Sequence, residues 1–427
     1  MDDRDVRRSI EAVWRIESAK LIAALTRITR DVGVAEELAQ DALVAALEQW
    51  PGSGMPDNPA AWLMAAAKHR AIDQLRHRKL AQRKHEELGR ELEVEQELQA
   101  ADTEAALDDE VGDDLLRLIF IACHPVLSTE ARVALTLKLL GGLTTGEIAR
   151  AFLVSETTIA QRIVRAKRTL SEARVPFELP QGTALAARLA SVLEVIYLIF
   201  NEGYTATAGS DWLRPGLCVD ALRLGRIVAG HAPMEPEAHG LLALMELQSS
   251  RLGARTGAAG EPILLLDQDR SRWDHLLVRN GLASLQKARR LGGGLGPYVL
   301  QAEIAACHAG ANVAADTDWT RIAALYDALA EIMHSPVVDL NRAVAVSMAY
   351  GPAEALQLVD ALREEPALQS YHLLSAVRGD LLAKLGRPEE ARAEFERAAA
   401  LTANARERGL MLERAASCDT ARPATTH

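Results

Sequence analysis

Two short stretches of the chain carry side chains whose types and spacing suit the binding of a polyanion. The first is "WLMAAAKHRAIDQLRHRKL" at residues 62–80, which is rich in cations although the formal net charge of the 427-residue chain is −11. Its basic residues are Lys68, Arg70, Arg76, Arg78 and Lys79, and its one acidic residue is Asp73. Because cations gathered on one segment bind phosphate groups, this stretch predicts contact with nucleic acid.

The second stretch, "LTTGEIARAFLVSETTIAQRIVRAKRTL" at residues 143–170, has the pattern of a helix-turn-helix. Thr144 and Glu147 form a capping box that opens one helix, and Ser155 caps a second helix after a short turn. On the second helix an apolar face opposes a face of hydroxyl, amide and guanidinium groups that suits a DNA major groove. The apolar residues are Ile159, Ile163, Ala166 and Leu170, and the polar residues are Thr157, Thr158, Gln161, Arg165 and Arg168, with Arg162 at their flank. The alternative is a surface helix with ordinary solvated cations.

Helical spacing also predicts helices on both sides of a break at "WPGSGMPDNP", residues 50–59. Before the break, Leu38, Ala42 and Ala46 form one apolar stripe. After it, the expected buried face consists of Met64, Ala67, Ala71 and Leu75, and the expected outward face consists of Trp62, His69, Arg70, Asp73, Arg76 and His77. An exposed Trp62 could stack on a base, whereas the alternative is a core anchor near the start of the helix.

Charge is unevenly distributed along the chain. Residues 1–80 are neutral overall, residues 81–113 carry −9, residues 114–174 carry +4 and the remainder carries −6. An acidic segment therefore separates two locally basic modules, and we expect it to be a solvated helix or a linker. Alanine, leucine, arginine and glutamate dominate with little clustering of β-branched residues, which favours an all-α fold.

Composition and motifs also argue against several classes of protein. The four cysteines lie far apart and form no CxxC pair, so neither a disulfide framework nor a zinc knuckle is expected. No HExxH, GxSxG, P-loop or GxGxxG pattern supports catalysis, and no cofactor or metal is expected. The start lacks the apolar core of a signal peptide, and "LASVLEVIYLIF" at 189–200 is judged too short to span a bilayer. We therefore expect a cytoplasmic, nucleoid-associated protein with no membrane contact.

The order of these segments resembles the extracytoplasmic-function (ECF) sigma factors of the sigma-70 family. "AEELAQDALVAALEQW" (35–50) is similar to the family's helix that grips the polymerase clamp, and "NPAAWLMAAAKHRAIDQLRHRKL" (58–80) is similar to its −10 segment. "LSTEARVALTLKLLGGLTTGEIARAFLVSETTIAQRIVRAKRTL" (127–170) resembles the domain that reads the −35 element. The resemblance covers about the first 170 residues and implies binding to core RNA polymerase, at its clamp and flap, and to promoter DNA.

The resemblance also implies three sets of site residues. The polymerase-binding set is Glu37, Gln40, Asp41 and Val44. The set facing the melted −10 strand is Trp62, Lys68, His69, Arg70, Arg76, His77 and Arg78. The set facing the −35 duplex is Ser155, Thr157, Thr158, Gln161, Arg162, Arg165 and Arg168.

Three positions depart from the family pattern. His69 stands where an asparagine is common, which alters the base preference inherited there. Ala160 replaces a common lysine and removes one phosphate contact. Leu153 occupies the usual position of the turn glycine, so a positive φ there would cost about 1 kcal/mol unless the turn differs.

Beyond residue 174, where typical family members stop, the chain continues for about 250 residues. "LLSAVRGDLLAKLGRPEEARAEFERAAAL" (373–401) carries small and large residues at the offsets of a tetratricopeptide helix pair: Gly379, Leu382, Ala391, Phe395 and Ala398. A weaker copy at 340–362 carries Ala343, Val346, Ala355 and Val359. The alternative is a helical bundle without repeats. With the sigma modules, this tail resembles sigma factors that bear a tetratricopeptide-like extension, which implies an appended regulatory domain or a protein partner.

These observations predict an all-α chain of two small helical sigma domains, the second a helix-turn-helix, followed by a large tetratricopeptide-like domain. The expected segments are residues 10–80 (region 2), 81–112 (acidic linker), 113–174 (region 4), 180–290 (a helical domain of unknown function) and 291–415 (repeats). The predicted function is that of an ECF sigma factor without catalysis of its own. The alternatives are a stand-alone helix-turn-helix regulator and a scaffold or enzyme with a vestigial DNA-binding head.

Overall fold

The described part of the chain is built from α-helices joined by loops and short 3₁₀ turns, which confirms the all-α prediction. A computed structural model describes residues 3–86, 107–180, 183–205, 213–257, 260–292 and 296–420. Within these residues the one β-type pairing is an isolated bridge between Thr256 and Pro262. The chain forms two compact units that divide after Ile196. Helix α8, Thr183–Tyr204, begins in the first unit and ends in the second.

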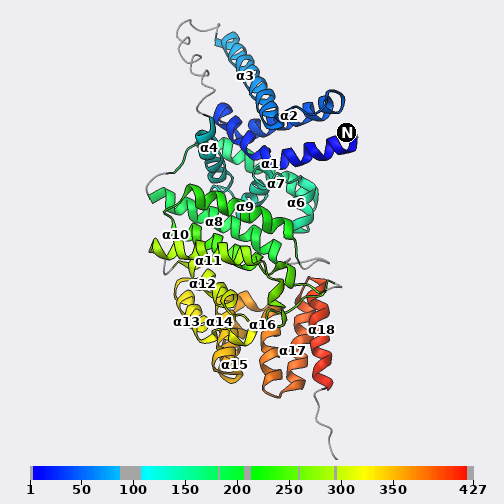
Figure 1. Ribbon diagram of the computed structural model, residues 1–427, viewed down its shortest axis with the longest axis vertical. Helices are drawn as coiled ribbons and strands as arrows, with labels where there is room; N and C mark the ends of the chain where they lie inside the picture. Colours follow the sequence, from blue (N-terminus) through cyan, green and yellow to red (C-terminus); the bar gives the residue numbers. More distant parts are fainter. Residues whose placement is uncertain are drawn as a thin grey trace, which may run out of the picture. The chain divides into compact units, whose positions relative to one another are not determined.

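The first unit holds the helices that carry the predicted binding residues (Figure 1). These helices are α1 (Asp3–Thr29), α2 (Val32–Ser53), α3 (Pro59–Glu86), α4 (Leu107–Ala122), α5 (Thr129–Leu139), α6 (Thr145–Phe152) and α7 (Glu156–Glu172). The predicted break at residues 50–59 is shorter than expected, because α2 continues through Pro51 to Ser53 and α3 already begins at Pro59. Most of the acidic segment, residues 87–106, lies outside the described residues.

Local capping explains where several of these helices begin. The Asp31 carboxylate accepts hydrogen bonds from the backbone N–H groups of Gly33, at 2.8 Å, and Val34, at 3.1 Å, and so starts α2. The Asn58 side chain does the same for Ala61 at the start of α3. Because the first N–H groups of a helix have no partner within it, such side chains fix its first residue.

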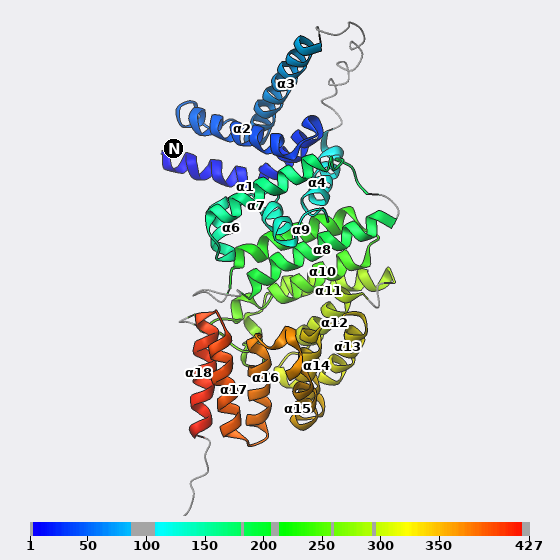
Figure 2. The same ribbon diagram turned by 180° about the vertical axis from the view of Figure 1, so that it is seen from behind.

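The second unit is a succession of helical hairpins, and Figure 2 shows α16, α17 and α18 side by side. Its helices after α8 are α9 (Pro215–His231), α10 (Pro236–Ser249), α11 (His275–Arg290), α12 (Pro297–Gly310), α13 (Trp319–Ile332), α14 (Pro336–Tyr350), α15 (Pro352–Ala361), α16 (His372–Lys384), α17 (Pro388–Leu401) and α18 (Ala405–Thr420). Six of these described helices begin with proline, whose fixed φ and missing N–H suit the first helical position.

The predicted helix pairs exist, and their marker residues form one core. Leu382, Ala391, Phe395 and Ala398 are buried together with Ala343, Ala355 and Val359, while Val346 packs against this cluster. Gly379 allows the close approach of α16 and α17, because a Cβ there would lie 3.0 Å from the Phe395 ring. The small Gly379 opposite the large Phe395 therefore explains why α16 and α17 can pack closely.

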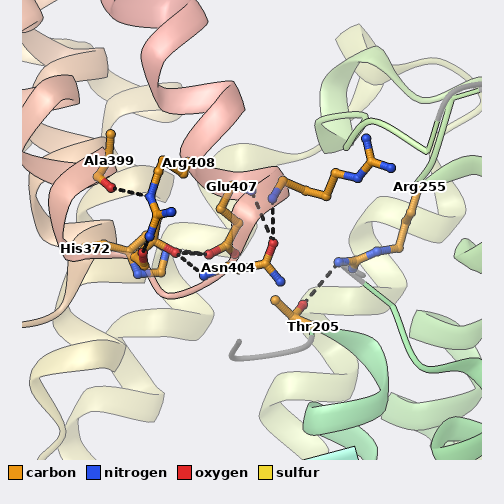
Figure 3. Close-up of polar contacts among 9 residues, drawn as sticks. Thr205, Arg255, His372, Ala399, Asn404, Glu407 and Arg408 are labelled. Carbon is orange, nitrogen blue, oxygen red and sulfur yellow. Dashed lines mark hydrogen bonds and ion pairs between the residues drawn. The ribbon is translucent and has the colours of Figure 1, made fainter. Parts of the chain in front are cut away.

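The corner between α17 and α18 satisfies its backbone groups with side chains (Figure 3). Arg408 donates to the carbonyls of Ala399, at 3.2 Å, and Thr402, at 2.8 Å, at the end of α17. The fully buried Asn404 accepts from the N–H of Arg406 at the start of α18. These contacts fix the angle at which α18 leaves α17.

The apolar stretch at residues 189–200 lies in a helix that is longer than the stretch itself. The stretch belongs to α8, of which residues Ala184–Tyr204 are long and apolar enough, by length and composition alone, to cross a membrane. Buried core helices pass the same criterion. Val192, Val195 and Ile199 in this helix are buried within the protein, which accounts for its composition.

The buried His308 gives the second unit a specific sensitivity to acid. Burial, with the nearby guanidinium groups of Arg251 and Arg270, lowers the pKa of His308 from 6.5 to about 4. Since the unfolded chain binds this proton more tightly, stability is complete above pH 6.5 and is lost as the pH falls toward 4. We expect His308→Gln to reduce by up to about 3 kcal/mol the destabilisation between pH 7 and pH 4, as measured by thermal unfolding at each pH. Equal pH dependence in both proteins would contradict this assignment.

Candidate nucleic-acid and polymerase interface

Helices α6 and α7 form the predicted helix-turn-helix. The Thr144 hydroxyl accepts from the N–H of Glu147 at 3.1 Å, and the Glu147 carboxylate accepts from the N–H of Thr144 at 2.8 Å, so the capping box is confirmed. The Ser155 hydroxyl accepts from the N–H of Thr158 at 3.1 Å and caps α7 as expected. These caps fix which side of α7 faces the core.

That core-facing side is the predicted one, because Ile159, Ile163, Ala166 and Leu170 are all buried. On the opposite side Ser155, Thr157, Gln161, Arg165 and Arg168 are exposed, whereas Thr158 and Arg162 are half-buried. Arg168 is paired with Glu172 at 2.6 Å, which offsets part of its charge. Arg165, near the middle of the exposed face, forms no ion pair with an acidic side chain among the described residues.

The turn between α6 and α7 has the left-handed geometry that usually favours glycine, although Leu153 stands at this position. Leu153 ends α6 with φ 50° and ψ 41°, a left-handed conformation that L-residues with a Cβ rarely adopt. Its side chain is 52% exposed and gains little packing in return. Leu153 therefore adopts the turn geometry that glycine would supply without strain.

Trp62 at the start of α3 is less exposed than its expected place on the outward face predicts. Its ring packs edge-on against the buried Trp50, with centroids 5.3 Å apart and an interplanar angle of 72°. Trp62 is consequently half-buried. Of the predicted buried stripe of α3, Ala67 and Ala71 are buried, but Leu63 takes the core position expected of Met64, which is only half-buried. The side chain of Leu75 lies outside the described part of the structure.

The basic side of α3 is exposed but partly neutralised. The His69 ring lies 3.2 Å from Asp73, and Arg76 lies 3.7 Å from the same carboxylate. Both basic side chains are more than two-thirds exposed, while Lys68 and Arg70 are half-buried. The side chains of His77 and Arg78 lie outside the described part of the structure.

The outer face of α2 contains the predicted polymerase-binding residues. Glu37, Gln40, Asp41 and Val44 are all exposed, and the stripe of Leu38, Ala42 and Ala46 beneath them is buried. Val44 is apolar and 51% exposed. The face thus combines two carboxylates, an amide and an apolar side chain.

Sequence reasoning missed Glu36, which lies beside this face. Glu36 is buried on α2 and is contacted by two lysines, Lys138 of α5 and Lys167 of α7. Near it a groove of about 870 Å³ runs between α1, α2 and the loop before α6, lined among others by Trp14, Gln40 and Val44. One acid on an amphipathic helix gives no signal in the sequence, because its partners come from residues more than 100 positions away.

The first half of α8 packs against α4 and α5 inside the first unit. Arg188 donates to the Phe120 carbonyl at 2.6 Å, and Ser191 donates to the Cys123 carbonyl at 2.7 Å. Arg132 of α5 forms an ion pair with Glu194 at 3.0 Å. The end of α4 is therefore satisfied by residues that follow the helix-turn-helix. Burial raises the pKa of Cys123 to about 11 and so keeps its thiol protonated.

The described residues contain no group of three or more His, Cys, Asp or Glu side chains placed to hold a metal ion. The Asp269 carboxylate accepts a hydrogen bond from the N–H of Ser271 at 2.9 Å. Its carboxylate thus starts a 3₁₀ turn.

Comparison with known families identifies three segments of the chain. Residues 16–80 match Sigma-70 region 2, residues 117–170 match Sigma-70, region 4, and residues 188–289 match a family of unknown function, DUF6596. No solved structure matches the chain.

Relatives cover the chain to different extents. The chain is 44% identical over 392 residues to uncharacterized protein R00370 of Rhizobium meliloti (strain 1021), an alignment that covers 90% of each protein. It is 27% identical over 169 residues to the ECF RNA polymerase sigma factor SigK of Mycobacterium sp. (strain KMS), which covers 38% of this chain and 80% of that protein. It is 25% identical over 168 residues to the probable ECF RNA polymerase sigma factor SigI of Mycobacterium tuberculosis (strain CDC 1551 / Oshkosh), covering 39% and 56% respectively.

The left-handed Leu153 supplies a test of the turn. We expect Leu153→Gly to raise the free energy of unfolding by about 1 kcal/mol, because glycine removes the Cβ strain at this φ. Thermal unfolding of the full chain measures the change, and Leu153→Ala, which keeps the Cβ, is the matched control. A destabilising Leu153→Gly would show that packing of the leucine outweighs the strain.

Proposed function

The chain belongs to the ECF group of sigma-70 factors, which bind core RNA polymerase and direct promoter-specific initiation, and from this premise we propose which of its residues do so. The observation that carries the proposal is the joint presence of regions 2 and 4, with a capped α7 that exposes a polar face away from its core. Sigma factors have no enzymatic activity in general, and we propose none for this chain.

We assign the −35 duplex to α7. Its N-terminal hydroxyl and amide groups, on Thr157, Thr158 and Gln161, suit base edges, and Arg162, Arg165 and Arg168 suit guanines or phosphates. Ser155 contributes the cap that sets the register of this face. Since α7 is 17 residues long, all of these side chains fall within one pass through a major groove.

We assign the melted −10 strand to α3 and the polymerase clamp to α2. The exposed cations of α3 supply phosphate contacts, and the half-buried Trp62, which packs against Trp50 at the start of the helix, is proposed to stack on a nucleotide. On α2, Glu37, Gln40, Asp41 and Val44 form the surface for the clamp. The acidic segment 81–112 is proposed to act as a nucleic-acid mimic in a cationic channel, because residues 81–113 carry a net charge of −9.

We further propose that the helical extension regulates the sigma domains or binds a protein partner through its repeats. The support is the packing of α8 on α4 and α5, by which Arg188 and Ser191 complete region 4. The proposed location is the cytoplasm, in association with the nucleoid. A stand-alone helix-turn-helix regulator remains the rival function, but it leaves the exposed faces of α2 and α3 without a role.

Run-off transcription tests the assignment of α7. We expect Arg165→Ala to lower transcript yield about tenfold from a −35-dependent promoter, because loss of one guanidinium contact costs about 1–3 kcal/mol. Arg392→Ala on α17, which removes another surface arginine, should leave the yield unchanged.

A promoter gel shift with and without core polymerase distinguishes the sigma function from the rival function, since tight specific binding by the chain alone would favour a stand-alone regulator. Absence of transcript from every promoter tested would contradict the sigma function.

The packing of α8 on region 4 provides a sharper test of the extension than truncation after residue 174, which would remove α8 entirely. We expect the double variant Arg188→Met, Ser191→Ala to lower both the thermal midpoint and the transcript yield, because two carbonyls at the end of α4 lose their donors. Arg223→Met on α9 is the control. Normal transcription by the double variant, with reduced stability, would contradict a functional role for this contact.

A further inference from the structure

A cluster of arginines and aromatic rings lies in the second unit, which carries none of the residues assigned to DNA or polymerase. Most of its members come from the segment between α10 and α11, and the others come from the ends of α8 and α12. We call it the arginine cluster, and it consists of Tyr204, Arg251, Arg255, Arg270, Trp273 and His308.

The guanidinium groups of the arginine cluster lie against two aromatic rings. The guanidinium carbon of Arg255 is 3.6 Å from the centroid of the Tyr204 ring, and that of Arg251 is 5.8 Å from the same centroid. Arg251 is also 5.8 Å from the ring centroid of Trp273, and Arg270 is 5.0 Å from it. The negative faces of the rings hold the guanidinium groups in place but do not neutralise them. Three positive charges are therefore kept close together.

Ion pairs do not balance the charges of Arg251 and Arg270. Neither forms an ion pair with an acidic side chain in the part of the chain that the structure describes, and both donate instead to neutral hydroxyl or carbonyl groups. Burial, with the charge of Arg251, lowers the pKa of Arg270 although the exposed Asp316 acts in the opposite direction. Arg255 donates to the Thr205 hydroxyl at 3.1 Å (Figure 3), and burial and Arg251 lower its pKa as well. The arginine cluster therefore has a positive potential that an anion would neutralise.

The same cluster contains buried nitrogen atoms that have no hydrogen-bond partner among the described residues. They are Nε of Arg270, Nε1 of Trp273 and Nδ1 of His308. Trp273 is 5% exposed and His308 is 9% exposed, so water does not cover these two rings. Burial, with the charges of Arg251 and Arg270, lowers the pKa of His308 to about 4 and keeps its ring neutral at pH 7. Since guanidinium and indole N–H groups can only donate, an acceptor atom is needed beside them.

The charge and the donors of this cluster suit a phosphate group better than a carboxylate. A phosphate monoester carries a charge of about −1.5 to −2 and three acceptor oxygens, which matches the two guanidinium groups without an ion pair. Arg251 is half-buried and donates to the Tyr204 hydroxyl at 2.5 Å, and its other N–H groups donate to none of the described residues. They can therefore bind phosphate oxygens in the planar geometry that arginine favours.

We propose that the arginine cluster binds the phosphate group of a small molecule, with Arg251 and Arg270 as its charged partners and the Trp273 indole as a neutral donor. The burial of Trp273 and His308 favours a small ligand, because the phosphates of a nucleic-acid backbone cannot leave their chain to reach buried nitrogens. The proposal assigns a ligand class to the helical extension and does not depend on the residues assigned to DNA or polymerase.

Titration calorimetry of the full-length chain with inorganic phosphate tests this site. The titrations are made at constant ionic strength in chloride buffer, so that general screening of charge is the same throughout. We expect saturable binding of one phosphate per wild-type chain. Arg251→Gln removes one charged partner, and we expect it to raise the Kd for phosphate at least about tenfold.

Trp273→Phe separates ligand binding from a purely structural role of this side chain. The phenyl ring keeps an aromatic face beside Arg251 and Arg270 but has no N–H group. We expect the Kd for phosphate to rise about three- to fivefold in the variant, with circular dichroism confirming that the chain is folded at the temperature of the titration. A tryptophan that acts only in packing would leave this Kd unchanged.

The control is Arg279→Gln on α11, which removes an exposed charge of the same unit outside the arginine cluster and should leave the Kd for phosphate unchanged. Absence of saturable binding by the wild-type chain, or equal binding by Arg251→Gln, would overturn the site. Equal affinity for acetate and phosphate would overturn its assignment to phosphate. None of these titrations uses core polymerase or promoter DNA, so failure of the site and failure of the proposed sigma function are distinguished.

Discussion

The backbone groups at the ends of helices need partners, and this requirement determines much of the structure. A chain made almost entirely of helices exposes unpaired N–H and carbonyl groups at every turn between them. Ser155 and Thr144 satisfy these groups at α7 and α6, and their positions decide which side of α7 faces outward. Arg188 and Ser191 satisfy the end of α4, so the DNA-reading domain is completed by the first helix of the extension. Arg270 does the same at the end of α12, where it donates to the carbonyls of His308 and Ala311.

Features that arise from neighbouring residues were predictable from the sequence. The two caps, the apolar face of α7 and the helix pair around Gly379 all depend on residues within one or two turns, or within one hairpin. For Leu153 the sequence left two outcomes open, a positive φ or a different turn, and the structure shows the positive φ. Whether those exposed side chains bind DNA or polymerase stays a prediction.

Features that depend on distant partners were not predictable. The orientation of Trp62 is set by Trp50, and the burial of Glu36 is set by lysines of α5 and α7. The apolar composition of α8 could not reveal that one helix belongs to two compact units. In each case the local sequence pattern is compatible with both a buried and an exposed environment, and contacts with residues distant in the sequence determine which one occurs.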